Sequence, residues 1–218
     1  MSTLSHQQAR RIYDRIGSWQ DTQGFYEDRA TARLLQHGDF TSADSVFEFG
    51  CGTGRFALRL LEAYLPATAH YRGADLSPEM VRLAQTRLAG YSSRAAVILT
   101  EGDPPTDEPD QSFDRFISIY VFDLLSHEDI RAVLREAHRM LRPNGLLCLS
   151  GISSGRGFVS RIVMSTLGWI QSIRPALVGG CRPVELLTFL PESEWQLQHH
   201  SKAVAFGVTS EILVAKRC

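Results

Sequence analysis

Hydrophobic and polar positions along this chain follow two different periods. Short apolar runs predict strands, and longer stretches with apolar residues three or four positions apart predict amphipathic helices. The runs fall at 45–49, 70–74, 96–100, 115–120 and 146–151, and the helical stretches between them at 54–65, 76–90 and 126–141. Strands that alternate with helices of this length are typical of a parallel sheet covered on both faces.

Residue types at the helix ends support these boundaries. Ser77 is a good N-cap, and Pro78 follows at the first helical position, where its missing N–H costs nothing. Ser126 and Asp129 predict a capping box, and the sequence RPNG at 142–145 predicts the end of that helix.

Both flanks of the alternating region differ from it. Residues 5–37 predict one or two amphipathic helices that break around 17–24, and residues 157–173 predict a strongly apolar helix. An irregular segment with a second short helix follows, and the tail predicts two strands around Gly207. The chain shows no repeat, low-complexity tract or linker, so we expect a single domain over 1–218.

Composition limits the classes of function. The 218 residues are 44% hydrophobic and 22% charged with a net charge of -1, which gives no electrostatic case for nucleic acid or an anionic membrane. The four cysteines form no CxxC pair or metal-binding spacing, so we expect free thiols and no metal. No apolar run reaches the roughly 18 residues of a membrane span, and the N-terminal sequence lacks the apolar core of a secretory signal. We therefore expect a soluble cytoplasmic protein.

Candidate chemistry begins where the first predicted strand meets a run of glycines. The sequence VFEFGCGTGR (46–55) places Gly50, Gly52 and Gly54 between that strand and the next helix. Glycines there let the backbone approach a ligand, and the helix start offers unpaired N–H groups. The spacing is G-x-G-x-G, with Arg55 in place of the last glycine of the dinucleotide fingerprint. A tight turn without a ligand would use the same residues.

A carboxylate follows at the end of the second predicted strand. Asp75 is reached from Gly50 through one strand–helix–strand step, where an acid can accept hydrogen bonds from a ribose diol. An aspartate in a turn before an N-cap is the alternative interpretation. The glycines and the acid together favour a ribose-bearing ligand.

These stretches resemble the class I S-adenosylmethionine-dependent methyltransferases. The first three motifs of that family are similar to EFGCGTG, GADLSPEMVRLA and EGDP, at 48–54, 73–84 and 101–104. The segments that carry its fourth strand, next helix and fifth strand are similar to QSFDRFISIYVFDLL and LREAHRMLRPNGLLCLS. The resemblance covers 45–151 in unbroken order and extends loosely over YDRIGSWQ (13–20).

The resemblance implies S-adenosylmethionine as cofactor and S-adenosylhomocysteine as product. Asp75 would bind the ribose, Met80 would pack against adenine, and Asp103 would face the adenine amino group. Glu48 would fix the glycine loop or meet the ammonium of the cofactor, and Tyr120 would cover its methionine end. The implied cofactor site consists of Tyr13, Glu48, Gly50, Cys51, Gly52, Gly54, Arg55, Asp75, Leu76, Met80, Gly102, Asp103, Pro104 and Tyr120.

The resemblance also implies the fold and the role of each part of the chain. We expect an α/β, doubly wound, Rossmann-like sheet of seven strands, mostly parallel with an antiparallel C-terminal strand and helices on both faces. Residues 1–40 would form an N-terminal helical lid and residues 45–151 the cofactor-binding core. Residues 152–218 would supply acceptor-side helices and a C-terminal β-hairpin.

The acceptor side departs from the family in informative ways. Asp123 and Leu124 stand where many small-molecule members carry His-His, and no Asn-Pro-Pro-Tyr or Pro-Cys motif follows the fourth strand. Nucleic-acid base methylators are therefore poor matches. A general base is needed only if the acceptor loses a proton during transfer. Asp123 is the best placed candidate, ahead of His127 and the pair His199–His200, and a loop carboxylate is the alternative interpretation.

The apolar helix predicted at 157–173 favours a small, lipophilic acceptor such as a quinone precursor or a lipid, although a core helix over the sheet has the same pattern. The aromatic residues Tyr13, Trp19, Phe25 and Tyr26 would close over the donor or form the apolar faces of short helices. We expect a monomer or homodimer, with peripheral membrane contact compatible with the sequence.

Two other classes of function stay open. A non-catalytic S-adenosylmethionine-binding or partner protein would keep this fold, but the intact acids Glu48, Asp75 and Asp103 argue against a degenerate site. A nicotinamide-dependent dehydrogenase is disfavoured by the glycine spacing and by the GDP stretch at 102–104.

Overall fold

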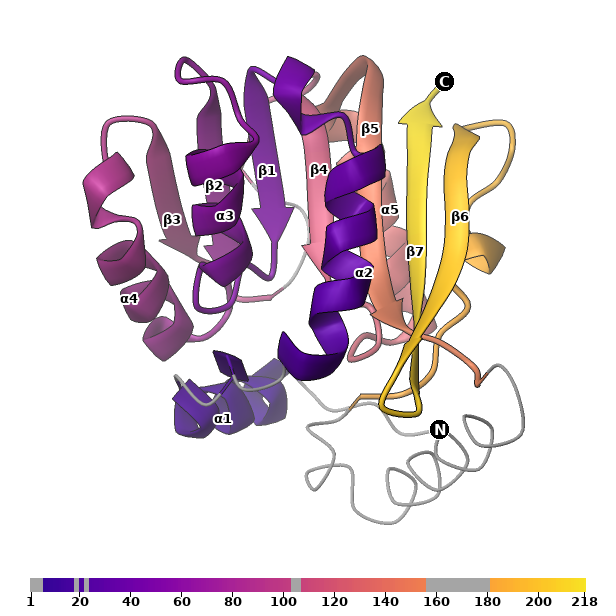
Figure 1. The fold of residues 1–218 in the computed structure, drawn as a ribbon, viewed down its shortest axis with the longest axis horizontal. Helices are drawn as coiled ribbons and strands as arrows, with labels where there is room; N and C mark the ends of the chain where they lie inside the picture. Colours follow the sequence, from indigo (N-terminus) through magenta and orange to yellow (C-terminus); the bar gives the residue numbers. More distant parts are fainter. Residues whose placement is uncertain (1–5, 18–19, 22–23, 103–106, 156–180) are drawn as a thin grey trace.

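The computed structural model describes residues 6–17, 20–21, 24–102, 107–155 and 181–218, and within these residues seven strands form one sheet (Figure 1). The strand order is β3-β2-β1-β4-β5-β7-β6. The strands are β1 (Ser45–Phe49), β2 (His70–Asp75), β3 (Ala95–Leu99), β4 (Phe113–Ile119), β5 (Leu141–Ile152), β6 (Trp195–Ala205) and β7 (Val208–Arg217). Among these strands β7 alone runs opposite to the other six, and it pairs antiparallel with β5 and β6. The predicted fold class is confirmed.

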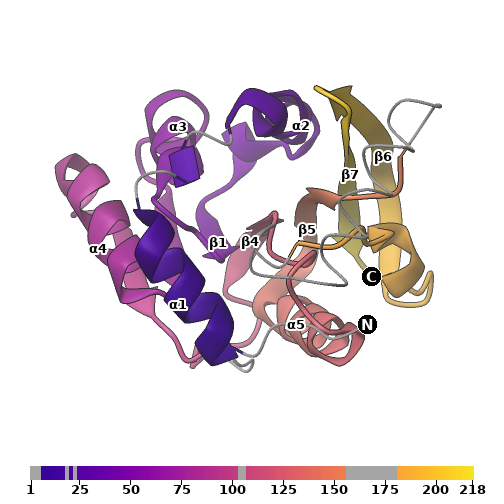
Figure 2. The same ribbon diagram turned by 90° about the horizontal axis from the view of Figure 1, so that it is seen from below.

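Helices cover both faces of the sheet. They are α1 (His6–Ile16), α2 (Gly24–His37), α3 (Arg55–Ala63), α4 (Pro78–Arg87) and α5 (His127–Met140). In Figure 1 α2 and α3 lie in front of the sheet and α5 behind it. Figure 2 shows α1 crossing the end of the sheet at which the parallel strands finish. The predicted break between two N-terminal helices and both predicted helix caps, Ser77 and the Ser126–Asp129 box, are confirmed.

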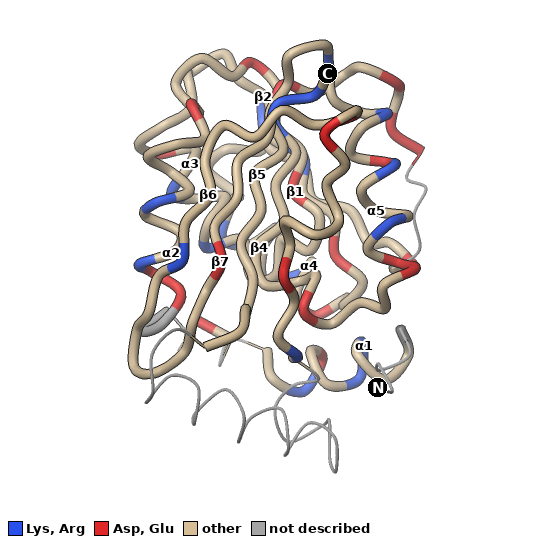
Figure 3. Tube along the Cα trace, turned by 90° about the vertical axis from the view of Figure 1, so that its right-hand side faces the viewer, with Lys and Arg blue, Asp and Glu red and all other residues tan. Residues whose placement is uncertain are grey.

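The core has two layers because both faces of the sheet are apolar. Leu34, Leu60 and Val81 pack from α2, α3 and α4 on one face, and Ile130 and Leu134 pack from α5 on the other. Strands buried on both faces are what a parallel sheet requires. In Figure 3 blue and red segments alternate along α2 and α5, outside these layers. None of the described helices has the length and apolar character needed to cross a bilayer.

The largest difference from the predicted boundaries is at β5. Strand β5 begins directly after α5, five residues before the predicted start, and includes the RPNG sequence at 142–145. Its pairing with β4 shifts there, from Phe113 opposite Leu141 to Arg115 opposite Leu146, and Asn144 takes a φ of 68°. The turn residues therefore form an irregularity inside an extended segment. The second short helix is a 3-10 turn at Leu186–Phe189, and the helix predicted at 157–173 lies outside the described residues.

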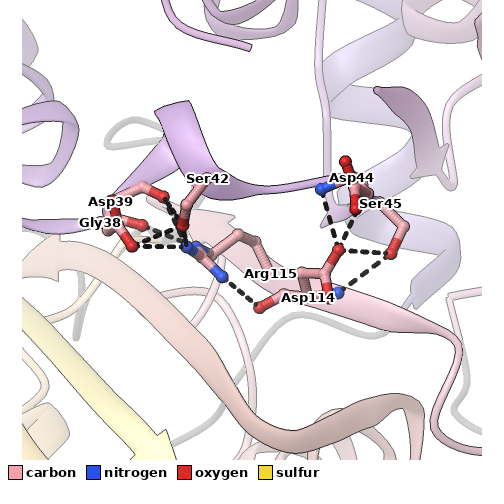
Figure 4. A network of polar contacts seen from close by, with 7 residues as sticks. All are labelled: Gly38, Asp39, Ser42, Asp44, Ser45, Asp114 and Arg115. Carbon is pink, nitrogen blue, oxygen red and sulfur yellow. Dashed lines mark hydrogen bonds and ion pairs between the residues drawn. The ribbon is translucent and has the colours of Figure 1, made fainter. Parts of the chain in front are cut away.

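A buried arginine holds the amino-terminal end of the sheet (Figure 4). Arg115 of β4 is 5% exposed and donates to the carbonyl oxygens of Gly38 and Asp39 and to Ser42 Oγ, the first at 2.7 Å and the last at 2.9 Å. Its neighbour Asp114 accepts from the backbone N–H groups of Asp44 and Ser45, each at 2.9 Å. These contacts join the turn after α2 to the start of β1 and β4, so they fix where the strands begin.

Replacing Arg115 by methionine removes these charge-assisted bonds and leaves buried carbonyl groups without donors. We expect the free energy of unfolding to fall by about 3 kcal/mol, measured by urea denaturation. Arg142→Met is the matched control, because its ion pair with Asp114 is 45% exposed on the arginine side and should cost under about 1 kcal/mol. Equal losses in the two variants would contradict the role given to Arg115.

Candidate functional site

A cavity opens at the carboxyl ends of β1, β2 and β4. This is the edge at which parallel α/β sheets bind their ligands. The lining residues come from the strand ends, the following loops and α1, and they are Ala9, Tyr13, Gln20, Phe49, Gly50, Gly52, Ala74, Asp75, Leu76, Met80, Thr100, Gly102, Ile119, Tyr120, Val121, Leu124, Leu125 and Asp129.

The floor of the cavity is a glycine turn that leaves β1. The N–H groups of Gly50 and Cys51 donate to Ala74 O of β2, at 2.8 and 3.1 Å. Gly50 has a φ of 75°, and a Cβ there would lie 2.3 Å from Val121 Cγ2, so no larger residue fits. Gly52 has a φ of 52° and a Cβ there would meet nothing within 4 Å, which leaves its backbone open to the cavity.

Asp75 stands at the end of β2 with its carboxylate directed across the glycine turn. One oxygen accepts from Gly52 N at 2.8 Å and the other from Ser77 N at 2.9 Å. Burial raises the pKa of Asp75, and the backbone donors of Ser77 and Gly52 oppose that shift. A carboxylate held in this way keeps lone pairs for a ligand hydroxyl at the cavity wall.

Glu48 lies one layer below this wall. It is 2% exposed, does not line the cavity, and accepts a hydrogen bond from Tyr71 Oη at 2.5 Å. Burial raises its pKa to about 8, and the Tyr71 bond opposes this only in part. The Glu48 carboxyl is thus bonded to β2 and is not among the groups that line the cavity.

The other predicted cofactor residues divide into three groups. Tyr13, Gly50, Gly52, Asp75, Leu76, Met80, Gly102 and Tyr120 line the cavity together. Cys51, Gly54 and Arg55 do not, because Cys51 is buried, Gly54 packs its Cα against Ala84 as the N-cap of α3, and Arg55 pairs with Asp28 at 2.6 Å. Asp103 and Pro104 lie outside the described residues, as does Trp19.

Tyr120 ends β4 in a strained conformation. Its φ is 54°, which is uncommon for a residue with a side chain. Its N–H donates to Ser150 O at 2.7 Å, and its hydroxyl shares a 2.6 Å hydrogen bond with Ser210 Oγ of β7. Tyr120 is therefore clamped between β5 and β7 while its side chain borders the cavity.

The candidate bases take different positions. Asp123 is 0% exposed and lies behind the cavity wall, beside Gly151. His127 is exposed at the start of α5. On β6 His199 stacks on His37, and His200 meets Glu211 at 2.7 Å. Neither histidine of this pair reaches the cavity.

The N-terminal segment is tied to the cavity rim by three carboxylates that the sequence analysis did not single out. Asp14 accepts from Ser77 Oγ at 2.6 Å, and Asp21 pairs with Arg87 at 2.6 Å and accepts from Thr53 Oγ1 at 2.6 Å. The third is the pair between Asp28 and Arg55 described above. No local pattern marks these aspartates, because they lie on two separate helices and in the break between them.

The similarity of this chain to known proteins agrees with this geometry. Residues 46–145 match the protein family described as Methyltransferase domain. The chain is a class I S-adenosylmethionine-dependent methyltransferase. The demethylmenaquinone methyltransferase of Tropheryma whipplei (strain Twist) is 29% identical over 182 residues, which is 77% of this chain and 71% of that protein. The malonyl-[acyl-carrier protein] O-methyltransferase of Serratia marcescens is 27% identical over 153 residues, 70% of this chain and 56% of that protein.

Solved structures show the same fold at low identity. The N-methyltransferase NodS from Bradyrhizobium japonicum, solved with S-adenosylhomocysteine, aligns with a TM-score of 0.70 and 16% identity over 97% of each chain. The [4+2]-cyclase SpnF aligns with a TM-score of 0.74 and 16% identity over 100% of this chain and 98% of that one. Because a cyclase shares this fold, the fold alone does not determine the reaction.

The residues of this methyltransferase suit its cofactor, S-adenosylmethionine. A half-buried carboxylate borders the cavity at Asp75, the open backbone of Gly52 leaves room for close approach, and Met80 supplies an apolar contact surface. When bound, the cofactor supplies a methyl group activated by its positive sulfur. Among the described residues no group of three or more His, Cys, Asp or Glu side chains could hold a metal ion.

Arg87→Met should loosen the N-terminal segment, because it removes the partner of Asp21. The pair is about 28–29% exposed on each side, so it should contribute under about 1 kcal/mol. We expect amide exchange in α1 and at 20–21 to become about 2–5-fold faster, measured by mass spectrometry. Arg82→Met is the control, because Arg82 pairs with Glu79 within α4. Unchanged exchange in the Arg87 variant would contradict the tie.

Glu48 should make stability depend on pH. Its folded pKa is raised to about 8 from 4.5, so between these values the folded state keeps a proton that the unfolded state has released, and stability falls as pH rises. Glu48→Gln removes this contribution. We expect the stability difference between wild type and Glu48→Gln to change by on the order of 2 kcal/mol from about pH 5 to pH 8, in urea denaturation. Parallel pH curves for the two proteins would contradict the assignment.

Proposed function

We propose that this methyltransferase transfers the methyl group to a small, apolar acceptor that enters on the Tyr120 side of the cavity. Asp75 would hold the ribose hydroxyls, Met80 the adenine, and Gly50 and Gly52 the methionine portion of the cofactor. Asp103 would complete the adenine contacts. Tyr120 would then stand at the methyl-bearing end.

The observation that carries this proposal is the uneven chemistry of the cavity wall. Asp75 and the open glycine backbone lie at the β1–β2 end. The wall contributed by α1 and by the loop after β4 is mainly apolar, with Ala9, Tyr13, Val121, Leu124 and Leu125, and Asp129 is its acidic member. A wall of this kind favours an acceptor that offers apolar surface beside its reacting atom.

Relatives support the same class of acceptor. The name of the Tropheryma whipplei protein indicates a demethylmenaquinone substrate, and that of the Serratia marcescens protein a malonyl group on an acyl-carrier protein. A tRNA N(3)-cytidine methyltransferase of Gallus gallus is also similar, at 28% identity over 130 residues. The net charge of -1 and the interspersed charges in Figure 3 favour a small molecule over a nucleic acid for this chain.

Methyl transfer mainly requires the protein to hold the acceptor and the cofactor in the correct position. Holding an acceptor in line with the methyl group can lower the barrier by roughly 7–11 kcal/mol. The rigid floor of the cavity, made of backbone bonded to β2, suits that task because it cannot change rotamer. Dispersal of the cofactor's charge during transfer favours a dry wall such as the one around Leu124.

Calorimetric titration with S-adenosylhomocysteine tests the site, with NADH as the control ligand. Saturable one-site binding of S-adenosylhomocysteine alone is expected. Transfer of a labelled methyl group to reduced naphthoquinones, and none to short charged metabolites, would then support the acceptor class. Binding without transfer to any of these acceptors would favour the non-catalytic alternative.

Asp75→Asn should weaken S-adenosylhomocysteine binding by about 10–100-fold. A carboxylate offers the ribose diol two acceptor oxygens and the amide only one, and a hydrogen bond to a charged group contributes about 1.5–3 kcal/mol. Asp107→Asn is the matched control, because Asp107 is exposed. Equal affinities in wild type and Asp75→Asn, with unchanged circular dichroism, would show that Asp75 does not hold the ribose.

A further inference from the structure

One buried hydrogen bond connects the cavity to β7. The hydroxyl of Tyr120 and the Oγ of Ser210 lie 2.6 Å apart, and both groups are buried. Tyr120 lines the cavity, whereas Ser210 does not, and β7 supplies none of the described lining residues. The bond therefore links the site to a strand that carries no part of the cofactor motifs.

The Ser210 hydroxyl is held in a fixed position. Ser210 is 2% exposed, and β7 lies between β5 and β6 in the sheet. Its partners in register are Ile152 on one side and Ala203 on the other. A residue in a strand that is paired on both sides cannot move without disturbing two hydrogen-bonded ladders. Ser210 is thus a rigid anchor for the side chain that it binds.

The main chain of Tyr120 is also fixed, in a conformation that costs free energy. Its φ of 54° lies in the left-handed region, which is unfavourable for a residue with a bulky side chain. Its N–H donates to Ser150 O at 2.7 Å, so Tyr120 is bonded through both its backbone and its hydroxyl. Strained residues persist where the surrounding structure holds them, and they are common at functional sites.

Tyr120 presents its aromatic ring to the cavity, because its hydroxyl is buried against Ser210. Burial raises the pKa of this phenol, and the Ser210 bond opposes the shift only in part, so the side chain stays protonated and neutral. It therefore brings no charge to the cavity. What it brings is a ring whose face carries partial negative charge.

The charged side chains that line the cavity are acidic. They are Asp75 and Asp129, and the described lining residues include no lysine, arginine or histidine. S-adenosylmethionine has a positively charged sulfur, whereas the sulfur of S-adenosylhomocysteine is neutral. A cation is attracted to the face of an aromatic ring within about 6 Å, and a neutral thioether lacks that attraction. With Asp75 at the ribose, Tyr120 is the group left for the sulfur end.

We propose that Ser210 is a positioning residue that holds the Tyr120 ring against the sulfonium of the bound cofactor, and that this pair sets the preference for the methyl donor over its product. The inference rests on the proposed function, which puts Tyr120 at the methyl-bearing end, and adds the role of Ser210 to it. The ring contact is lost when the methyl group has left and the sulfur has become neutral. Release of the product is then favoured over release of the donor.

The test compares the affinities of each protein for S-adenosylmethionine and S-adenosylhomocysteine, measured by calorimetric titration. The ratio of the two affinities is the readout, because damaged packing weakens both ligands, whereas a lost ring contact weakens the donor alone. Tyr120→Leu removes the ring and should lower the preference for the donor by about 3–10-fold. Ser210→Ala keeps the ring without its anchor and should lower it by about 2–5-fold.

A matched control and a combined variant sharpen the test. Ser45→Ala also removes a serine hydroxyl that is bonded at 3.0 Å, to Ser112 O, but Ser45 begins β1 at the opposite end of the sheet. Its affinity ratio should stay within about 1.5-fold of wild type. Tyr120→Phe removes the Ser210 bond from the other side. Combining it with Ser210→Ala should therefore lower the ratio no further than Ser210→Ala alone.

Three results would overturn the proposal. They are an unchanged ratio in Tyr120→Leu, equal weakening of both ligands in Ser210→Ala, and additive effects of Tyr120→Phe and Ser210→Ala on the ratio. If Ser210→Ala does not fold, Tyr120→Phe tests the same hydrogen bond, and an unchanged ratio there would be equally decisive. Failure of wild type to bind either ligand would instead remove the proposed function, so the two failures are distinguishable.

Discussion

The site depends on one junction of main chain, where the turn after β1 is bonded to the end of β2. Two successive N–H groups, from Gly50 and Cys51, share Ala74 O, and the next glycine donates to Asp75. The side chain of Val121, which follows β4, packs close to Gly50 and leaves no room for a larger residue there. The floor of the cavity and the position of its acid are consequences of that crossing.

Charge is distributed unequally between the two ends of the sheet. At the amino-terminal end the buried ionic groups are bonded to carbonyl oxygens and N–H groups, and they hold strands together. At the carboxyl-terminal end Glu48 and Asp123 are buried and Asp75 is half-buried, and loss of water around these acids raises the pKa of each. The buried charges that stabilise the sheet thus lie at one end of the strands, and the acids of the cavity region lie at the other. Burial of an acid costs free energy, and the stabilising contacts at the opposite end offset that cost.

Much of this could be predicted from the sequence because it depends on local patterns. The strand periods, the caps at Ser77 and Ser126, and the glycine turn followed by Asp75 each need only a few adjacent residues. Contacts between distant segments left no such mark. Three contacts form only in the folded chain and have no signal in the local sequence. They are the ion pairs Asp21–Arg87 and Asp28–Arg55 and the hydrogen bond between Tyr71 and Glu48. The strand start at Leu141 was missed because RPNG has the composition of a turn.

The position of β7 has a consequence for how the molecule is made. Its residues, Val208–Arg217, come after every other described strand in the sequence, yet β7 lies between β5 and β6. Helix α2, which is synthesised early, rests on this late hairpin, with Arg29 and Arg33 donating to Val204 O and Lys202 O at 3.0 and 3.1 Å. While the chain is being synthesised, α2 and the free edge of β5 therefore lack their packing and pairing partners until β7 has left the ribosome. Such long-range closure predicts slow folding and a window in which chaperones would find exposed apolar surface.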